Sequence, residues 1–467
     1  MIDTKAIRCA VLQLAFSGKL TERQEGDDSV TALLQRISPN KDIRQTEDNP
    51  YSIPDHWAWV KLGDLYTVNP KVQADEDTIA AFIPMERISA GFDGTFSYEE
   101  QKWSTASKNH TRFADGDVAF AKITPCFENR KSFIASSLPN GIGGGTTELI
   151  ILRQKEILSQ YTFYVILDER FIRTGVGTYK GMVGQQRVKL DVLKKYQIPV
   201  PPLSEQQRII EKIENAFLCL DTIDDLQNQY HDNLFALKGK LIDAAVQGRL
   251  TNQFLEDGSA KDLYDFVQQE RKRQENLGII KPEELLPNVE KEGMLFSIPD
   301  SWYWTHLGNV SYIVRGGSPR PIKQFITTKT NGINWIKIGD VEKGGKYIYQ
   351  TGEKIIPEGE KKSRRVYPGD FLLTNSMSFG RPYISKIEGC IHDGWLLIRN
   401  LKSFDTDYLY YLLSSHYLFN QFAQKASGST VDNLNIDKVK SAIIPLPPLA
   451  EQKRIVDKLN ELLPLCE

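Results

Sequence analysis

The sequence predicts an α+β fold in which two pseudo-symmetric α/β units with irregular β-structure are separated by long antiparallel coiled-coil helices. Three observations carry this prediction: an internal repeat, a long run of apolar residues at helical spacing, and strand-like segments broken by turn residues. The 467 residues suit two to four domains of about 100–200 residues each. The 40% hydrophobic and 25% charged residues exclude a wholly disordered chain.

A duplicated boundary motif is the strongest sign of the repeat. Residues 198–213 read IPVPPLSEQQRIIEKI and residues 444–459 read IPLPPLAEQKRIVDKL, with ten of sixteen positions identical. Upstream, SIPDHWAWVKLGDL begins at Ser52 and SIPDSWYWTHLGNV begins at Ser297. Each unit therefore opens with Ile-Pro-Asp-x-Trp and closes with a proline-rich segment.

We accordingly expect two globular units, over residues 51–200 and 296–447. Weaker matches between them pair Gly116–Asp117 with Gly369–Asp370, Arg153 with Arg399, and Tyr164 with Tyr410.

The two ends of the chain read as parts of one split repeat. LAFSGKLT near the start resembles AAVQGRLT in the middle, which places Gly18 on Gly248. The sequence is therefore interpreted as a circularly permuted tandem repeat. Its second long helix is divided between an N-terminal segment, residues 1–40, and a C-terminal helix, residues 449–467.

Residues 203–247 predict one long central helix. Ser204 stands three residues before Gln207 in a capping-box pattern, and two prolines precede it. Apolar residues then recur at spacings of three and four. Paired antiparallel with the split helix, this helix would place the two units at opposite ends of a rod. The alternative is that these amphipathic helices pack onto their own domains. A polar connector, residues 248–295, leads to the second unit.

Short strands and turns characterise the globular units. GINWIKIGDV (332–341), KYIYQ (346–350) and GDFLLTN (369–375) have the β-branched and aromatic content of strands. Helical stretches are expected near residues 160–170 and 406–422. Each unit is therefore predicted to mix helices with irregular β-structure.

The motif survey predicts a chain without a catalytic site. The sequence has no GxxxxGK[ST] phosphate loop, no HExxH and no GxSxG, and its six histidines lack metal-ligand spacing. Asn69–Pro70 is followed by Lys71, so the motif of amino-methyltransferases acting on bases is also missing. We expect no metal or cofactor in this chain.

The apolar pattern, the N-terminus and the cysteines together predict a cytoplasmic protein. No apolar run approaches the ~20 residues of a membrane span, and the N-terminus lacks the pattern of a signal peptide. The cysteines form no CxxC pair and fit a reducing compartment; they are Cys9, Cys126, Cys219, Cys390 and Cys466.

Charge is distributed unevenly along the chain. The formal net charge is −2, which argues mildly against a stand-alone nucleic-acid binder. Residues 203–296, however, carry 11 basic and 18 acidic side chains, whereas residues 51–200 have a net charge of +1 and residues 297–447 a net charge of +6. An acidic helical region thus masks basic globular units.

Polar and basic loops in both units are candidate DNA contacts. Arginine pairs with guanine edges, asparagine or glutamine with adenine, and serine or backbone amides with phosphate. In the first unit the candidates are Lys122, Thr124, Asn129, Arg130, Lys131, Lys180, Gln185, Gln186 and Arg187. In the second unit they are Arg315, Ser318, Arg320, Lys337, Asn375, Ser376, Ser378, Arg381, Lys425, Ser427 and Ser429. The alternative for any one of them is a solvated turn residue.

The doubled IPxPPLxEQxxI boundary, the IPxxW opening and the RGGSP and INWIKIGDV runs resemble the specificity subunit of type I restriction–modification enzymes. The resemblance covers essentially the whole chain. It implies two target recognition domains, at residues 51–200 and 296–447, and helices that dock methyltransferase (M) subunits. Two departures stand out: TVNPK (67–71) replaces RGGSP in the first unit, and Ala450 replaces the serine cap.

The expected function is therefore non-catalytic recognition of a bipartite, asymmetric double-stranded DNA site. The resemblance implies M subunits as partners, with restriction/translocase (R) subunits as a further possibility and no membrane. S-adenosylmethionine, ATP and Mg²⁺ are expected only in those partners. Two rival hypotheses are a stand-alone endonuclease with a diverged site and a scaffold protein that binds no DNA.

Overall fold

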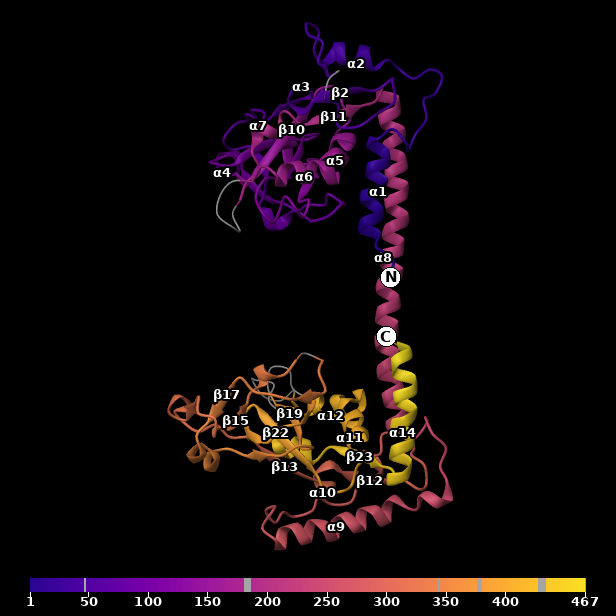
Figure 1. Cartoon of the computed structure of the whole chain (residues 1–467), viewed down its shortest axis with the longest axis vertical. Coiled ribbons are helices and arrows are strands. Elements are labelled where there is room, and N and C mark those ends of the chain that lie inside the picture. The colour runs from indigo at the N-terminus through magenta and orange to yellow at the C-terminus, as the bar shows by residue number, and fades with distance from the viewer. Residues whose placement is uncertain (46–47, 180–185, 343, 376–379, 427–433, 467) are drawn as a thin grey trace. The chain divides into compact units, whose positions relative to one another are not determined.

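The chain divides into two compact units, Met1–Asn228 and Gln229–Glu467 (Figure 1). The computed structural model describes residues 1–45, 48–179, 186–342, 344–375, 380–426 and 434–466. Both units mix helices and sheets, as the sequence predicted. The helices are α1 (Thr4–Phe16), α2 (Val30–Ile37), α3 (Leu62–Leu65), α4 (Trp103–Ala106), α5 (Ser159–Leu167), α6 (Glu169–Val176), α7 (Leu190–Leu193), α8 (Leu203–Val246), α9 (Ala260–Asn276), α10 (Leu307–Val310), α11 (Thr406–Ser414), α12 (His416–Ala426), α13 (Ile436–Lys440) and α14 (Leu449–Leu462).

Three sheets form the first unit. The first joins β1 (Arg44–Gln45), β2 (Ala58–Lys61) and β11 (Gln197–Val200). The second has the order β3 (Tyr66–Val68), β10 (Leu149–Gln154), β7 (Val118–Ala121) and β8 (Ser132–Ile134). The third has the order β5 (Glu99–Lys102), β4 (Ile79–Ile83), β9 (Ile142–Gly145) and β6 (Thr111–Ala114), with β4 and β9 parallel.

The second unit repeats this plan. Its first sheet pairs β12 (Tyr303–His306) with β23 (Ile443–Leu446). The second has the order β13 (Ser311–Arg315), β22 (Trp395–Asn400), β19 (Phe371–Thr374), β20 (Pro382–Ser385) and β16 (Tyr347–Ile348). The third has the order β14 (Ile326–Thr327), β17 (Glu353–Ile355), β15 (Ile333–Ile336), β21 (Gly389–Ile391) and β18 (Arg365–Val366), again with one parallel pair, β15 and β21.

The matched strands confirm the internal repeat. The order β3-β10-β7-β8 corresponds to β13-β22-β19-β20, and both third sheets are built around a parallel central pair. The matched arginines are paired alike: Arg153 binds Asp117 at 2.7 Å, and Arg399 binds Asp370 at 2.6 Å. Each predicted helical stretch is a pair of helices, α5–α6 and α11–α12.

Helix α1 packs antiparallel along the first part of α8. Arg8 binds Asp221 at 2.5 Å and Asp224 at 2.9 Å, and Thr4 Oγ1 donates to Asp224 at 2.6 Å. The chain start therefore lies farther along α8 than the end of α1, whose Phe16 enters the core of the unit. In the second unit, Ile455 and Leu459 of α14 belong to the same apolar cluster as the last turns of α8.

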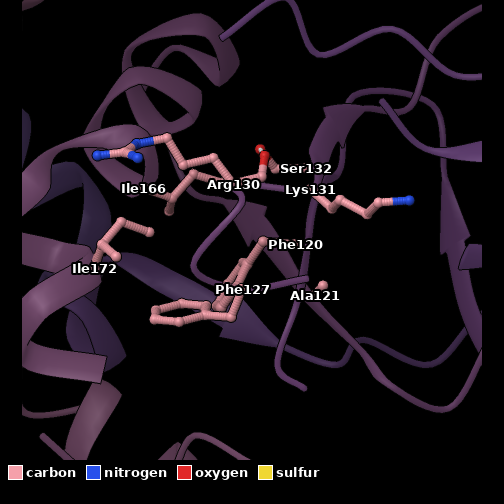
Figure 2. A pocket seen from close by; sticks show the side chains of 8 residues that line it. All are labelled: Phe120, Ala121, Phe127, Arg130, Lys131, Ser132, Ile166 and Ile172. Atoms are coloured by element: carbon pink, nitrogen blue, oxygen red, sulfur yellow. Dashed lines mark hydrogen bonds between the residues drawn. The ribbon is translucent and has the colours of Figure 1, made fainter. Parts of the chain in front are cut away.

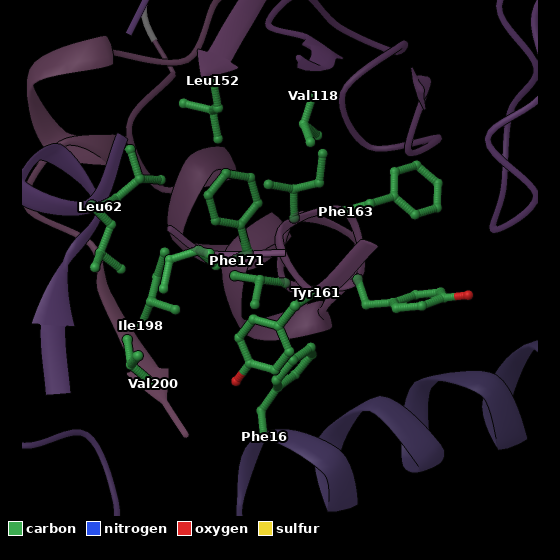
Figure 3. Close-up of a cluster of buried hydrophobic side chains, with 14 of the residues drawn as sticks. Phe16, Leu62, Val118, Leu152, Tyr161, Phe163, Phe171, Ile198 and Val200 are labelled. Atoms are coloured by element: carbon green, nitrogen blue, oxygen red, sulfur yellow. The ribbon is translucent and has the colours of Figure 1, made fainter. Parts of the chain in front are cut away.

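The main core of the first unit joins α1 to the globular part (Figure 3). Phe16 meets Tyr161 of α5 edge to face, with ring centroids 5.6 Å apart. Tyr161 is fully buried, and its hydroxyl donates to the carbonyl of Pro199 at 2.7 Å. Burying a side chain as large as Phe16 stabilises the fold by about 2–3 kcal/mol. The N-terminal helix is thus an integral part of this unit.

A buried carboxylate at the start of each boundary helix joins three segments of its unit. In the first, Glu205 accepts hydrogen bonds from Trp57 Nε1 at 2.9 Å and Thr21 Oγ1 at 2.9 Å. In the second, Glu451 accepts hydrogen bonds from Trp302 Nε1 at 2.7 Å and Thr251 Oγ1 at 3.0 Å. Both glutamates have zero solvent exposure. The tryptophan of the IPDxW opening, the threonine after GKL or GRL, and the glutamate of PPLxEQ therefore form one repeated cluster.

The glycines of the GKLT and GRLT segments permit this clustering. Gly18 and Gly248 each have a φ of +70°, a left-handed conformation that favours glycine. A Cβ on Gly18 would lie 2.3 Å from Pro54 Cδ, and one on Gly248 would lie 2.5 Å from Pro299 Cδ. Both glycines thus allow the chain to pass directly over the proline of the Ile-Pro opening.

The predicted capping box at Ser204 is wrong in its detail. Helix α8 already begins at Leu203, and the backbone N–H groups of Leu203 and Ser204 donate to the carboxylate of Asp28 at 3.2 and 3.0 Å. The Ser204 hydroxyl donates to Asp28 and to Asp27 instead of capping its own helix. The cap comes from the loop before α2, because an acid there reaches the free amides of the first turn.

The expected polar connector, residues 248–295, contains helix α9. Arg271 of this helix is buried and donates to the carbonyls of Gly308 and Ser311 at 2.5 and 3.0 Å. Val267 is also fully buried, so one face of α9 packs on the second unit near the start of β13. The high charge of this segment concealed that apolar face.

Candidate nucleic-acid interface

Four of the predicted DNA contacts in the second unit converge on Asp393, in the turn before β22. Ser318 Oγ donates to Asp393 Oδ1 at 3.0 Å, and Arg320 binds Oδ2 at 3.4 Å. Arg315 Nε and Asn375 Nδ2 donate to the Asp393 carbonyl at 3.0 and 2.9 Å. The RGGSPR segment and the end of β19, distant in sequence, are therefore held together by one acidic residue.

The Asp393 carboxylate is ionised within a positively charged cluster. Burial acts to raise the pKa of Asp393, but the hydrogen bond from Ser318 and the neighbouring charges of His392 and Arg320 outweigh it and hold the pKa below its usual value. His392 Nε2 lies 3.0 Å from Asp393 Oδ1. Two arginines against one carboxylate leave a net positive charge, which suits an anionic ligand such as a phosphate.

The remaining candidates of the second unit differ in exposure. Arg381 is exposed, and its guanidinium has no hydrogen bond or ion pair within the described part of the chain; its backbone is fixed by Thr374 on β19. Lys337 pairs with Glu353 at 2.9 Å. Asn375 is 1% exposed, so we assign it to loop structure and remove it from the set of direct DNA contacts.

Several candidates lie outside the described residues. These are Lys180, Gln185, Ser376, Ser378, Ser427 and Ser429. Lys425 belongs to the last turn of α12, but its side chain is not described.

In the first unit, two predicted loops form one polar strip. The Thr124 backbone N–H donates to the carbonyl of Gln186 at 3.0 Å, and the Gln186 N–H donates to Thr124 Oγ1 at 3.1 Å. The Val188 N–H donates to the carbonyl of Lys122 at 2.9 Å. The structure thereby brings the segment that begins at Lys122 beside the segment at Gln186 and Arg187.

An acidic residue holds this strip as well. Arg187 binds Glu148 through Nε and through a terminal nitrogen at 2.7 Å. This hydrogen bond lowers the pKa of Glu148. Glu148 immediately precedes β10, the strand that matches β22. Cations and amides are the residue types that predict DNA contacts, so the sequence pattern does not single out these two acids. Their position just before a buried strand is the available signal.

Arg130 does not belong with the predicted DNA contacts. Its side chain is 5% exposed; it binds Glu169 at 2.5 Å and donates to the carbonyl of Leu167 at 2.9 Å. Figure 2 shows its guanidinium directed toward Ile166 and the helices, whereas the Lys131 side chain points the opposite way. Lys131 donates to the carbonyl of Met85 at 2.8 Å, and Asn129 is exposed. A cavity of about 10 Å³ beside Arg130 has room for no more than one water molecule.

Within the described residues, no group of three or more His, Cys, Asp or Glu side chains is arranged to hold a metal ion. The same part of the chain contains no helix of the length and apolar character needed to cross a bilayer.

Comparison with known proteins identifies the family to which this architecture belongs. The family model described as type I restriction modification DNA specificity domain matches residues 54–229 and 299–465. The specificity subunits of the type I restriction enzymes EcoEI and EcoAI of Escherichia coli are each 29% identical to the chain, over 99% of its length and 89% of theirs.

Two solved structures share the fold. The HsdS subunit from Thermoanaerobacter tengcongensis has a TM-score of 0.51 at 20% identity, over 90% of this chain and 93% of that chain. The second is a chain from a structure of the type I R-M system, described as showing the structural basis of complex assembly and conformational transition. It has a TM-score of 0.59 at 20% identity, over 89% of this chain and 92% of that chain.

Proposed function

Because this chain belongs to the type I restriction–modification DNA specificity family and is a specificity subunit with two copies of the family domain, we propose that it reads a bipartite, asymmetric site in double-stranded DNA. Each copy reads one half of the site. The observation that carries this proposal is the matched pair of frameworks with unlike loops: Gly316 to Arg320 follow β13, whereas Asn69 and Pro70 follow β3. Equal frameworks place different side chains in equivalent positions, so the halves differ in sequence.

Direct contacts are proposed at cations of two loop clusters, the residues around Asp393 in the second unit and the polar strip around Lys122 and Arg187 in the first. The arginines of these clusters are exposed, and the lysines are half-buried. In the second unit these are Arg315, Arg320 and Arg381, with Lys337 at the side. In the first unit they are Lys122, Lys131 and Arg187. Guanidinium groups reach guanine edges or phosphates, and the polar groups around them fix their direction.

We further propose that M subunits dock on the paired helices α1 and α8. Apolar side chains on this pair remain exposed, at Ile7 and Leu14 of α1 and at Leu218 and Leu226 of α8. Helix α8 also carries an acidic surplus, with eight acidic and four basic side chains. Such a surface suits a partner with an apolar patch and a basic rim. Helix α8, which belongs to both units, would then set the separation between the half-sites.

The chain itself is proposed to be non-catalytic. S-adenosylmethionine, ATP and Mg²⁺ serve the M subunits and, where they are present, the R subunits. Incubation of the purified chain with DNA and Mg²⁺ should leave the DNA intact. Cleavage by the chain alone would favour the rival endonuclease.

The direct test is DNA binding by the chain assembled with its M subunits. Affinity for genomic fragments that carry the cognate motif is expected to exceed the affinity for scrambled fragments by at least about a thousandfold and to fall steeply with salt. Binding of M subunits with no salt-dependent DNA affinity would favour the scaffold alternative.

A further inference from the structure

In each unit an acid lies just before the matched central strand and meets the cations of the neighbouring loop. Asp393 lies in the turn before β22, where it meets Arg315, Ser318 and Arg320. Glu148 lies directly before β10, where it meets Arg187. The two strands hold equivalent central positions in their sheets. A DNA-binding surface is expected to be positive, so an acid among the contact cations of each unit needs an explanation.

The contacts of Asp393 separate into two kinds. Its backbone carbonyl holds Arg315 Nε and Asn375 Nδ2, and these bonds do not depend on the side-chain charge. Its carboxylate accepts a hydrogen bond from Ser318 Oγ at 3.0 Å, lies 3.0 Å from His392 Nε2, and holds Arg320 at 3.4 Å. The Arg320 side chain is 83% exposed. An exposed pair at this distance is weak and exchanges readily. Arg320 can therefore leave Asp393 for a DNA phosphate, while the loop keeps its shape.

We propose, on the basis of the function proposed above, that Asp393 and Glu148 are specificity-determining residues that suppress non-specific phosphate binding. Each carboxylate competes with DNA phosphates for a loop cation. On random DNA, a phosphate contact replaces an existing ion pair, so the net gain in binding free energy is small. On the cognate site, the cation contacts a base edge while it stays paired with the carboxylate, so no ion pair is lost. Specificity is a difference of affinities, and a penalty on the wrong ligand widens it.

The substitutions Asp393→Asn and Glu148→Gln test this role in the assembled complex. Both remove the charge and keep the size, and the Asp393→Asn variant retains the contacts made by the backbone carbonyl. Affinity for a scrambled duplex should rise roughly three- to tenfold, with the salt slope steepened by about 0.9 for each phosphate gained. Affinity for the duplex that carries the methylated motif should rise less, so the specificity ratio falls.

Asp265→Asn is the matched control. Asp265 forms an exposed ion pair with Lys261 on α9, so its substitution changes the net charge equally at a site outside the proposed DNA contacts. It should leave both affinities within about twofold of the original.

The outcomes are distinct. Unchanged affinity for scrambled DNA, an equal rise for both duplexes, or a loss confined to the motif duplex would each overturn the proposal. Where one variant fails to fold, the other gives the same readout in the opposite unit. Failure of the proposed function itself appears separately, as absence of motif preference in the unsubstituted complex.

Discussion

Trp57 and Glu205, 148 residues apart, are joined by a hydrogen bond of 2.9 Å between the indole Nε1 and a carboxylate oxygen that has no contact with solvent. The same bond recurs in the second unit between Trp302 and Glu451. It links the residue just before β2 to α8, and the residue just before β12 to α14. The repeated sequence motifs IPDxW and PPLxEQ are therefore two sides of one contact.

Replacement of Glu205 by alanine should destabilise the first unit by about 2–3 kcal/mol, because Trp57 Nε1 would be left buried without an acceptor and half-buried Thr21 Oγ1 would lose its acceptor. Glu205→Gln should cost less, since an amide oxygen remains. Hydrogen exchange measured by mass spectrometry resolves the two units, and faster exchange should be confined to residues 1–228. Equal protection in the alanine variant and the original protein would contradict this role.

Alanine at Gly18 or Gly248 should destabilise its unit by about 2–3 kcal/mol, because the Cβ meets a proline ring and the backbone is strained. Gly278 is the matched control: it also ends a helix and its φ is +69°, but a Cβ there meets nothing within 4 Å. Its substitution should cost about 1 kcal/mol. Thermal unfolding of the three variants provides the comparison, and equal losses at all three positions would exclude the steric explanation.

Arg130 and Arg381 should separate stability from binding. Arg130→Ala removes a buried guanidinium together with its bonds to half-exposed Glu169 and to the Leu167 carbonyl, and should lower the free energy of unfolding by about 2–3 kcal/mol. Arg381→Ala should leave unfolding within about 0.5 kcal/mol of the original and weaken binding to the cognate duplex by about 1–3 kcal/mol. Unfolding and DNA titration of both variants decide the matter. If Arg381→Ala alters neither affinity nor specificity, its assignment fails.

Acid should weaken the cap of α8. The hydrogen bond from Arg208 lowers the pKa of Asp27, so the ionised form is favoured in the folded state. Stability from this pair is complete above the ordinary carboxyl pKa near 4 and is lost as the pH falls through the lower folded value. The difference in urea midpoint between the original protein and Asp27→Asn should therefore shrink from pH 7 to pH 3. Asp257, which is paired with Arg454, should show the same pH dependence. A difference in urea midpoint that stays constant from pH 7 to pH 3 would contradict the account.

Repeats and periodicity were sufficient to predict the α+β fold, its internal repeat and the long helix α8. The duplicated motifs paired Arg153 with Arg399 and Gly18 with Gly248, and each pair makes equivalent contacts. A side chain's direction was not predictable in this way. Arg130 resembles its neighbour Lys131 in sequence, yet a positive φ of 56° and a local acid turn it inward. The roles of Asp393 and Asp28 depend on contacts between distant segments, which local patterns do not encode.

The bases methylated in the host genome test the central claim most directly. Long-read sequencing of a strain with the original chain should reveal one bipartite motif, which disappears when the chain is deleted. After residues 51–200 are exchanged for the corresponding domain of a relative, one half of the motif should change and the other half should persist. A motif that survives the deletion, or an exchange that alters both halves or neither, would contradict the assignment of one half-site to each unit.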